Sequence, residues 1–357
     1  MRRKTPNRRG RYFAVGLLCL LLWGGVFFFS GGKTTQPRRP SANLINLAEP
    51  LVDYAIPLDA ASAVLMDAQN GQVLFAKNAH KQVPPASLTK MITALVAVQG
   101  RELDLPVKIS SAAARTSGTR VGLAAGEEIQ LGSLVAGMLL RSGNDAAVAV
   151  AQGLAGSVEA FSRLMNQQAA ELGADSSQFM NPNGLTAEGH LSTAYDLALI
   201  AKALLADESL AQIVGCQKTL VPWEGGKREI QNINRFVREY PGALGVKTGY
   251  TDEAGFCLAA AAERRGKKLI AIVLGCASSQ SRYNDAIRLL EQGFANYRYL
   301  STGKGKANYP AQYHVVRKGQ TLSSIARQYK LTEGILAEAN KLGPPHRLDV
   351  GQILLIP

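Results

Sequence analysis

One serine and one lysine of this 357-residue chain have a spacing that suits nucleophilic catalysis. They are Ser87 and Lys90, in a segment that reads Ser-Leu-Thr-Lys and opens an apolar stretch with helical periodicity. Because residues three apart share one face of a helix, the Ser87 hydroxyl and the Lys90 amine can come within hydrogen-bonding distance. A lysine accepts a proton only when it is neutral, and burial together with a second nearby cation lowers its pKa. This chemistry therefore requires a second lysine.

Two later motifs supply that lysine and further polar groups. They are Ser142-Gly-Asn144 and Lys247-Thr-Gly249, and the second occurs only once in the chain. Average residue usage predicts about one Ser-x-x-Lys match by chance in a chain of this length, but only about a tenth of a Lys-Thr-Gly match. Chance copies of the shorter patterns are present at Ser301-Thr-Gly-Lys304 and Ser41-Ala-Asn43. The order of the three motifs is therefore stronger evidence than any one of them.

In this order the motifs resemble those of the penicillin-binding serine D,D-peptidases. The residues around them are similar to the low-molecular-mass D-alanyl-D-alanine carboxypeptidases, over about residues 48 to 300. The resemblance implies removal of the terminal D-alanine from peptidoglycan stem peptides through a serine acyl-enzyme, which β-lactams also form as covalent inhibitors. The longer phrases that carry it are Pro85-Ala-Ser-Leu-Thr-Lys90, Asn181-Pro-Asn-Gly-Leu185, Gly189-His-Leu-Ser-Thr193, Lys247-Thr-Gly-Tyr-Thr-Asp252 and Ala254-Gly-Phe256.

The resemblance also implies a role for each motif residue. Ser87 would be the acylated nucleophile and Lys90 its proton acceptor. Ser142 would relay the proton to the leaving D-alanine, while Asn144 would hold the substrate amide and orient Lys90. The backbone N–H groups of Ser87 and Tyr250 would form the oxyanion hole, a contribution of about 3 kcal/mol per donor.

The third motif is expected to bind the substrate. The resemblance implies that Lys247 and Thr248 face the terminal carboxylate, and that Gly249 and Tyr250 also take part in substrate binding. Arg282 matches a further family position that addresses the same carboxylate, although a surface residue at the start of a helix explains it equally well.

Other functions remain open beside the carboxypeptidase interpretation. A D,D-endopeptidase would use the same residues. A serine β-lactamase needs a base for the deacylating water, commonly a glutamate in a Glu-x-x-x-Asn loop, and the corresponding stretch here reads Asn181-Pro-Asn-Gly-Leu185. A non-catalytic wall-binding protein that kept the fold is the third alternative, and the intact motifs argue against it.

The pattern of elements predicts an α+β fold, with an antiparallel sheet flanked by helices and a helical subdomain. A hairpin is expected where Asn70-Gly71 separates two apolar runs. Strands are predicted at 255–262 and 268–275, and a terminal helix at 282–299. Further helical periodicity covers Ser87 to Val98, Gly132 to Gln152, Val158 to Leu172 and Thr193 to Leu205.

The last 45 or so residues read as a separate small module after a Gly-rich, polar linker. Strand-like ends, Tyr313-His-Val-Val316 and Ile353-Leu-Leu-Ile356, enclose two short helical stretches at 321–329 and 332–340. The module resembles a LysM domain, which implies a βααβ fold and binding of glycan strands that contain N-acetylglucosamine. Contact with another protein is the alternative use.

The amino end predicts export. Residues 1–40 hold nine Lys or Arg and no acid, which leaves a net charge of +4 for the rest, and residues 12–29 carry no charge. This length suits either a cleavable signal peptide or an uncleaved membrane anchor, and places the rest in the periplasm or at the outer face of the cytoplasmic membrane. Basic residues at one end do not suggest a nucleic-acid partner.

The predicted parts are 1–11 (basic), 12–29 (signal or anchor), 30–47 (linker), 48–300 (D,D-carboxypeptidase), 301–311 (linker) and 312–357 (LysM).

Cysteine and histidine usage indicates neither a disulfide framework nor a metal site. Cys19 lies in the apolar segment, and the other three cysteines are an odd number. Cys257 and Cys276 flank a predicted hairpin, where either a bridge or ordinary packing is conceivable, and packing is favoured. The four histidines are too scattered to bind a metal together, and His190 is expected to bond locally. We expect no cofactor.

Overall fold

The computed structural model describes residues 56–302 and 312–356, except 317, 318, 330, 341, 345, 350 and 351. The predicted basic region, signal or anchor, first linker and Cys19 lie outside these residues, as does nearly all of the second linker. None of the helices in the described part combines the length and the hydrophobicity needed to cross a bilayer.

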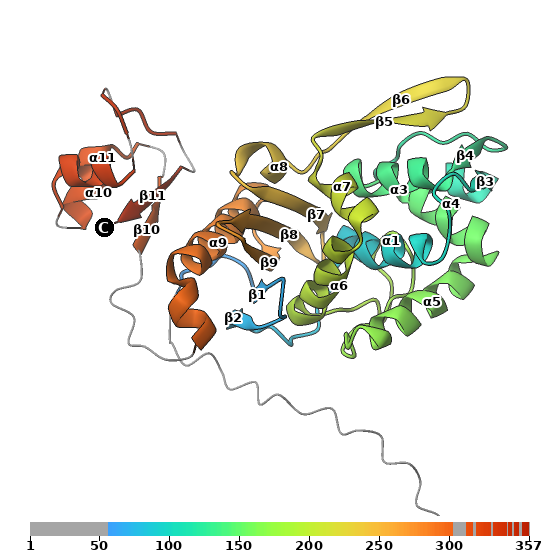
Figure 1. Cartoon of the computed structure of the whole chain (residues 1–357), viewed down its shortest axis with the longest axis horizontal. Helices are drawn as coiled ribbons and strands as arrows, with labels where there is room; N and C mark the ends of the chain where they lie inside the picture. The colour runs from blue at the N-terminus through green and yellow to red at the C-terminus, as the bar shows by residue number, and fades with distance from the viewer. Residues whose placement is uncertain are drawn as a thin grey trace, which may run out of the picture. The chain divides into compact units, whose positions relative to one another are not determined.

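A five-stranded antiparallel sheet forms the centre of the larger part (Figure 1). Its strand order is β2-β1-β9-β8-β7. The bounds are β1 Ser62–Asp67, β2 Val73–Lys77, β7 Ala243–Thr251, β8 Gly255–Arg264 and β9 Lys267–Cys276. The predicted hairpin and the two predicted strands are thus present, and β7 is an edge strand.

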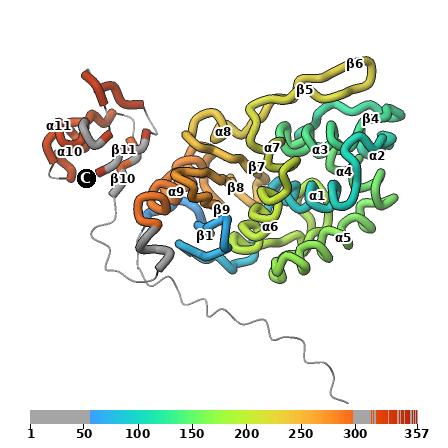
Figure 2. The backbone as a smooth tube through the Cα atoms, in the orientation of Figure 1, coloured from blue at the N-terminus to red at the C-terminus, as the bar shows by residue number. Residues whose placement is uncertain are grey.

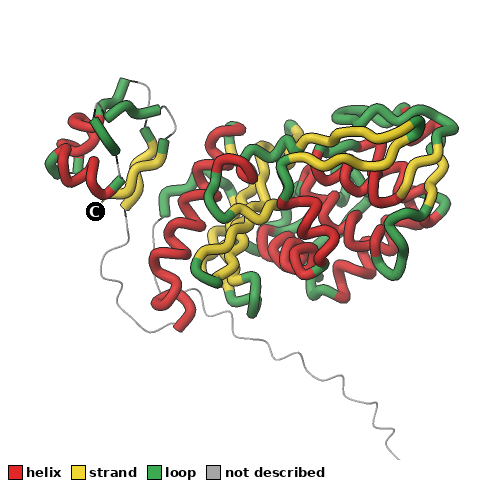
Figure 3. The backbone as a smooth tube through the Cα atoms, turned by 45° about the horizontal axis from the view of Figure 1, so that its top comes forward, coloured by secondary structure: helices red, strands yellow, loops and turns green. Residues whose placement is uncertain are grey.

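Both faces of this sheet are buried, which the alternation along β8 shows directly. Cys257, Ala259 and Ala261 face one hydrophobic core, and Leu258 and Ala260 face the other. Helix α9 (Ser279–Thr302) and the short α8 (Phe236–Glu239) pack on the second face, and α6 (Ala194–Ala206) packs on the first (Figure 3).

The same alternation decides the state of the two strand cysteines. Cys276 pairs in register with Phe256, and both face the same side of the sheet. Cys257 follows Phe256 in β8 and therefore faces the opposite side. Both are free thiols, as is Cys216. The prediction that Cys257 and Cys276 pack without a bridge is confirmed.

A cluster of helices lies beyond α6 and carries two of the three motifs. Its helices are α1 Lys90–Val98, α2 Ser111–Ala114, α3 Leu131–Leu140, α4 Asn144–Ala155, α5 Val158–Glu171 and α7 Glu208–Gly215, together with the 3-10 turn η1 Ala86–Thr89. Two small hairpins accompany them, β3 Pro106–Lys108 with β4 Glu128–Gln130, and β5 Lys218–Trp223 with β6 Gly226–Gln231. The β5–β6 hairpin runs along α3 (Figure 2).

The region of helical periodicity at 132–152 contains a break that matters for function. Residues 132–152 are two helices, α3 and α4, because Ser142 has φ +62° and Gly143 is extended. Helical periodicity continues on both sides of the break, so the apolar pattern alone does not reveal it. The break places Ser142 in a tight turn between the helices.

The C-terminal part has the predicted βααβ order. Strands β10 (Gln312–Val315) and β11 (Ile353–Ile356) pair antiparallel, with α10 (Leu322–Gln328) and α11 (Glu333–Ala339) between them along the chain. Thr321 and Ser324 form a reciprocal capping box at the start of α10. The part has its own core, which includes Leu322, Ile325, Leu336 and Leu354.

Candidate active site

Ser87 lies in the 3-10 turn that leads directly into α1, where two glycines allow close packing. Ala86 has φ +48°, and a Cβ at Gly184 would lie 1.9 Å from the Ala86 carbonyl oxygen. A Cβ at Gly249 would lie 3.1 Å from the Ser87 nitrogen. Gly184 therefore needs to be glycine, and Gly249 of the third motif lets β7 pack closely against the serine turn.

The Lys90 amine is fully buried and lies at the centre of the site. Its Nζ is 2.8 Å from Ser87 Oγ, 2.8 Å from Asn144 Oδ1 and 2.5 Å from the carbonyl oxygen of Asn183. Burial, and next the positive charge of Lys247, hold the pKa of Lys90 well below its usual value, against a smaller opposing effect of Asp145.

A neutral Lys90 amine can satisfy these three contacts in one way that suits catalysis. A neutral lysine has two N–H donors and one lone pair. Asn144 Oδ1 and the Asn183 carbonyl can only accept, so they take the two N–H groups. The Ser87 hydroxyl can donate, and its proton then points at the remaining lone pair. The geometry suits transfer of that proton to Lys90.

Ser142 and Lys247 form a second buried pair. Lys247 Nζ donates to Ser142 Oγ at 2.9 Å and to the Thr248 carbonyl at 2.8 Å. Burial, followed by the charge of Arg282, lowers the pKa of Lys247 to about 7. The charge of Lys247 also lowers the pKa of Lys90, so the required second lysine, with Ser142 bonded to it, lies near the Ser87–Lys90 pair.

The other predicted binding residues lie on or beside β7. Thr248 is buried, whereas Tyr250 is half exposed and donates through its hydroxyl to Asp252 at 2.7 Å. Arg282 Nη1 donates to the Gly249 carbonyl at 3.0 Å. The Arg282 guanidinium is thus held against the backbone of the third motif rather than in solvent.

Two residues that the motifs did not single out hold the site together. Asn183 provides the backbone carbonyl for Lys90, and a backbone atom leaves no trace in residue type. Asp145 is fully buried and accepts from the N–H groups of Val121, Gly122 and Leu123. The N–H of Asn144 donates to the Thr119 carbonyl in the same loop at 2.7 Å.

His190 bonds locally, as expected, but its partner adjoins the nucleophile. Its Nδ1 accepts from the Met180 N–H at 3.0 Å, so Nε2 carries the proton and donates to Thr89 Oγ1 at 2.8 Å. Thr89 in turn donates to the Ala86 carbonyl. Burial, and next the charge of Lys90, lower the pKa of His190 to about 4, so the ring is neutral at neutral pH.

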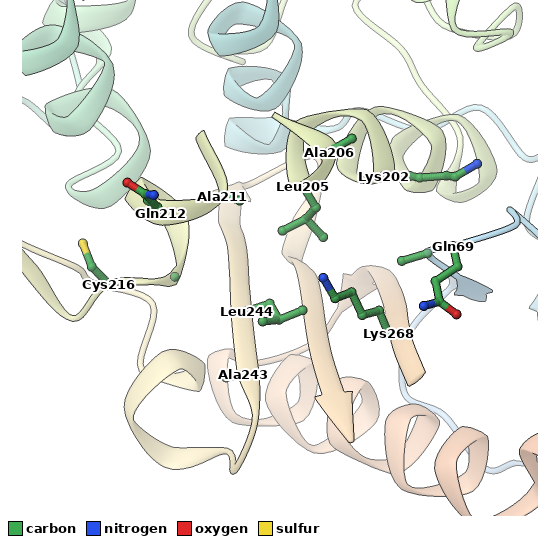
Figure 4. A pocket seen from close by; sticks show the side chains of 12 residues that line it. Gln69, Lys202, Leu205, Ala206, Ala211, Gln212, Cys216, Ala243, Leu244 and Lys268 are labelled. Atoms are coloured by element: carbon green, nitrogen blue, oxygen red, sulfur yellow. The ribbon is translucent and has the colours of Figure 1, made fainter. Parts of the chain in front are cut away.

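Two other kinds of candidate site, a metal site and a separate cavity, fit the motifs less well than the Ser87 site. The described residues contain no group of three His, Cys, Asp or Glu placed to hold a metal ion. A cavity of about 630 Å³ opens at the other end of β7, lined by Leu205, Leu244, Lys202 and Lys268 among others (Figure 4). It contains none of the motif residues, and the chemistry argues for the Ser87 site.

Comparison with known proteins agrees with the motifs. Residues 49–278 match the family model of the D-alanyl-D-alanine carboxypeptidases, and residues 314–357 match that of the LysM domain. The D-alanyl-D-alanine carboxypeptidase DacF of Bacillus subtilis is 34% identical over 307 residues, which are 79% of this chain and 79% of that protein.

Solved structures give the same result. A D-alanyl-D-alanine carboxypeptidase from Mycobacterium tuberculosis is 34% identical, covers 66% of this chain and 91% of its own, and superimposes with a TM-score of 0.63. A point mutant of the Streptomyces K15 DD-transpeptidase is 30% identical, covers 67% of this chain and 98% of its own, and also has a TM-score of 0.63. The predicted resemblances and fold class are confirmed: the chain belongs to the D-alanyl-D-alanine carboxypeptidase family of serine hydrolases and carries a C-terminal LysM domain.

Proposed function

We propose that this protein removes the terminal D-alanine of peptidoglycan stem peptides, with Ser87 as nucleophile and neutral Lys90 as base. The observation that carries the proposal is the buried Lys90 amine, whose Nζ lies within hydrogen-bonding distance of Ser87 Oγ, Asn144 Oδ1 and the Asn183 carbonyl oxygen. In the first step Ser87 Oγ attacks the carbonyl carbon of the penultimate D-alanine, and its proton moves to Lys90.

The remaining groups act on the charges that this step creates. The N–H groups of Ser87 and Tyr250 stabilise the oxyanion, and β7 suits this because an edge strand leaves backbone groups unpaired by β8. Ser142, bonded to Lys247, passes a proton to the nitrogen of the leaving D-alanine as the C–N bond breaks. Water then hydrolyses the ester on Ser87 and regenerates the free hydroxyl.

Substrate binding follows from the positive charge at β7. The terminal carboxylate lies against Lys247 and Thr248, with Arg282 adding its charge from behind the strand. A β-lactam offers a carboxylate and a strained amide to the same groups, so it acylates Ser87 covalently. The stretch that corresponds to the glutamate-bearing loop of a β-lactamase reads Asn181-Pro-Asn-Gly-Leu185 and holds no acid, so we expect the acyl-enzyme to turn over slowly.

The LysM domain binds glycan strands containing N-acetylglucosamine and keeps the enzyme at its polymeric substrate. Residues 12–29 export the chain to the periplasmic side of the cytoplasmic membrane and anchor it there. This location is supported by the family, whose substrate lies in the cell wall.

The direct test is release of D-alanine from a synthetic peptide that ends in D-Ala-D-Ala, measured for the full chain and for Ser87→Ala. We expect one D-alanine per peptide from the wild-type protein and none from the variant. Cleavage of cross-linked dimers but not of the linear peptide would indicate an endopeptidase. Rapid hydrolysis of benzylpenicillin without D-alanine release would indicate a β-lactamase, and inactivity toward both substrates would indicate a non-catalytic wall protein.

A further inference from the structure

A second basic site adjoins the catalytic residues on the side of Ser142. An open groove of about 280 Å³ is lined by Arg120, Arg141 and Arg228, together with Val121 and residues 229–231. None of the three arginines belongs to a catalytic motif, but Arg141 directly precedes Ser142 in the chain. Through Arg141 the groove is connected, along the chain, to the turn that carries the proposed proton relay.

The backbone that carries these arginines is held firmly. Val121 donates its N–H to Asp145 and fits against Gly143, where an added Cβ would lie 2.8 Å from the Val121 side chain. Arg120 thus lies between two anchored residues, since the Thr119 carbonyl accepts from Asn144. Arg141 closes α3 as its C-terminal cap.

Arg228 reaches the groove from β6 and its guanidinium is also fixed. Its Nη1 donates to the Val121 carbonyl at 3.1 Å, and its guanidinium lies 3.8 Å from the centre of the Trp223 ring. Three separate segments of the chain are therefore brought together around Val121, each contributing one arginine.

Acidic residues of the groove do not neutralise the positive charges of its arginines. Arg120 and Arg141 are exposed and make no side-chain hydrogen bond or ion pair in the described structure. The acid that lines the groove, Glu229, is itself bonded to Lys218 at 2.7 Å. The guanidinium groups of Arg120 and Arg141 are thus available for an anion, and arginine forms paired hydrogen bonds with carboxylates.

We propose that this groove binds a second carboxylate of the substrate peptide, carried by a residue upstream of the scissile bond. The inference rests on the proposed function, in which the terminal carboxylate is already bound by Lys247 and Thr248. Because the terminal D-alanine ends the peptide, any further carboxylate must come from upstream residues. The arginine groove then makes the enzyme prefer stem peptides with a free side-chain or branch carboxylate over their amidated counterparts.

The test uses pairs of synthetic peptides ending in D-Ala-D-Ala that differ only in glutamate or glutamine at one of the two preceding positions. For the full-length protein we expect kcat/KM to be about fivefold or more higher for one glutamate peptide than for its glutamine partner. In Arg120→Gln/Arg141→Gln this ratio should fall to about one, with the glutamine peptide hydrolysed as before. The matched control, Arg163→Gln/Arg265→Gln, removes two exposed arginines elsewhere and should keep the preference.

Equal kcat/KM values for both peptides of each pair, or a preference that survives Arg120→Gln/Arg141→Gln, would overturn the inference that the groove binds a substrate carboxylate. Either result would leave the proposed function intact. If the wild-type protein hydrolyses none of the peptides, the proposed function fails instead. Calorimetric binding of the same peptides to Ser87→Ala then decides the inference. Tighter binding of the glutamate peptide that depends on Arg120 and Arg141 supports it, and equal binding contradicts it.

Discussion

Gly249 lies so close to Ser87 that even a methyl group at this position would crowd the serine turn. A Cβ on Gly249 would be 3.1 Å from the Ser87 nitrogen and 2.9 Å from Leu88 Cδ1. The glycine of the third motif therefore favours close packing: it lets β7 approach the turn that carries the nucleophile without a displacement of that turn. The proposed oxyanion hole is made of one N–H from each of these two segments.

Gly249→Ala should consequently impair acylation more than folding. The added methyl group must push η1 and β7 apart, and we expect the rate of acylation by labelled penicillin to fall about tenfold or more, since misplaced groups at a reacting centre are costly. The unfolding free energy should decrease by about 1 to 3 kcal/mol, as for other overpacked sites. Gly334→Ala adds a methyl group where no atom lies within 4 Å and serves as the control. Unchanged acylation in Gly249→Ala would refute this role of the glycine.

Arg282 should set the upper pH limit of activity through Lys247. The pKa of Lys247 is about 7, so the charged form that binds the substrate carboxylate is lost above neutral pH. The charge of Arg282 disfavours protonated Lys247, and its removal in Arg282→Gln therefore raises this pKa. We expect the alkaline limb of the kcat/KM profile for a D-Ala-D-Ala peptide to move to higher pH. Arg265→Gln, which removes an exposed arginine in the β8–β9 turn, should leave the limb in place; movement to lower pH in Arg282→Gln would contradict the assignment.

His190 should make the catalytic part less stable in acid. Its pKa is about 4 in the folded protein against 6.5 as an unperturbed side chain, so the folded state binds fewer protons between these values. Stability is then lost as the pH falls from 6.5 to 4, by about 3 kcal/mol for a shift of this size. Urea unfolding followed by Trp223 fluorescence should show this loss in the wild-type protein and a smaller one in His190→Gln. Equal losses in both proteins would exclude His190 as the cause.

Much of this fold is predictable from local sequence patterns. The Asn70-Gly71 turn and the apolar runs of β8 and β9 identify the sheet, and caps such as Thr193 mark the helices. The sequence does not reveal β7 as a strand, because Gly245, Lys247 and Gly249 interrupt the run of apolar residues that would predict one. Lys247 and Gly249 are the functional part of the strand, whereas Gly245 packs against Val214 of α7.

The features of the site also divide into those that the sequence reveals and those that it does not. Ser87, Lys90 and Lys247 are found from residue type and spacing, whereas the Asn183 carbonyl is a backbone atom placed by a loop that packs on α1. The break at Ser142 is also invisible to periodicity, because α3 and α4 are both apolar. Long-range packing, which a local pattern does not encode, decides both features.

Removing the LysM domain should separate binding from catalysis. Because this domain has its own core, deletion of 312–357 should leave hydrolysis of a small peptide within about twofold of wild type. Binding to purified sacculi should weaken about tenfold or more, since the contact with the glycan is lost. A variant in which a Gly/Ser chain of equal length replaces the domain controls for chain length. Loss of peptide hydrolysis to the same extent as sacculus binding would contradict two independent functions.

The central claim is that neutral Lys90 takes the proton of Ser87. Mass spectrometry of the intact protein during incubation with benzylpenicillin tests it most directly, in wild type, Ser87→Ala and Lys90→Met, with the exposed Lys81→Met as control. We predict one stable adduct on Ser87 in wild type and Lys81→Met, none in Ser87→Ala, and formation about 100-fold slower or more in Lys90→Met. An adduct in Ser87→Ala, or acylation of Lys90→Met at the wild-type rate, would contradict the account.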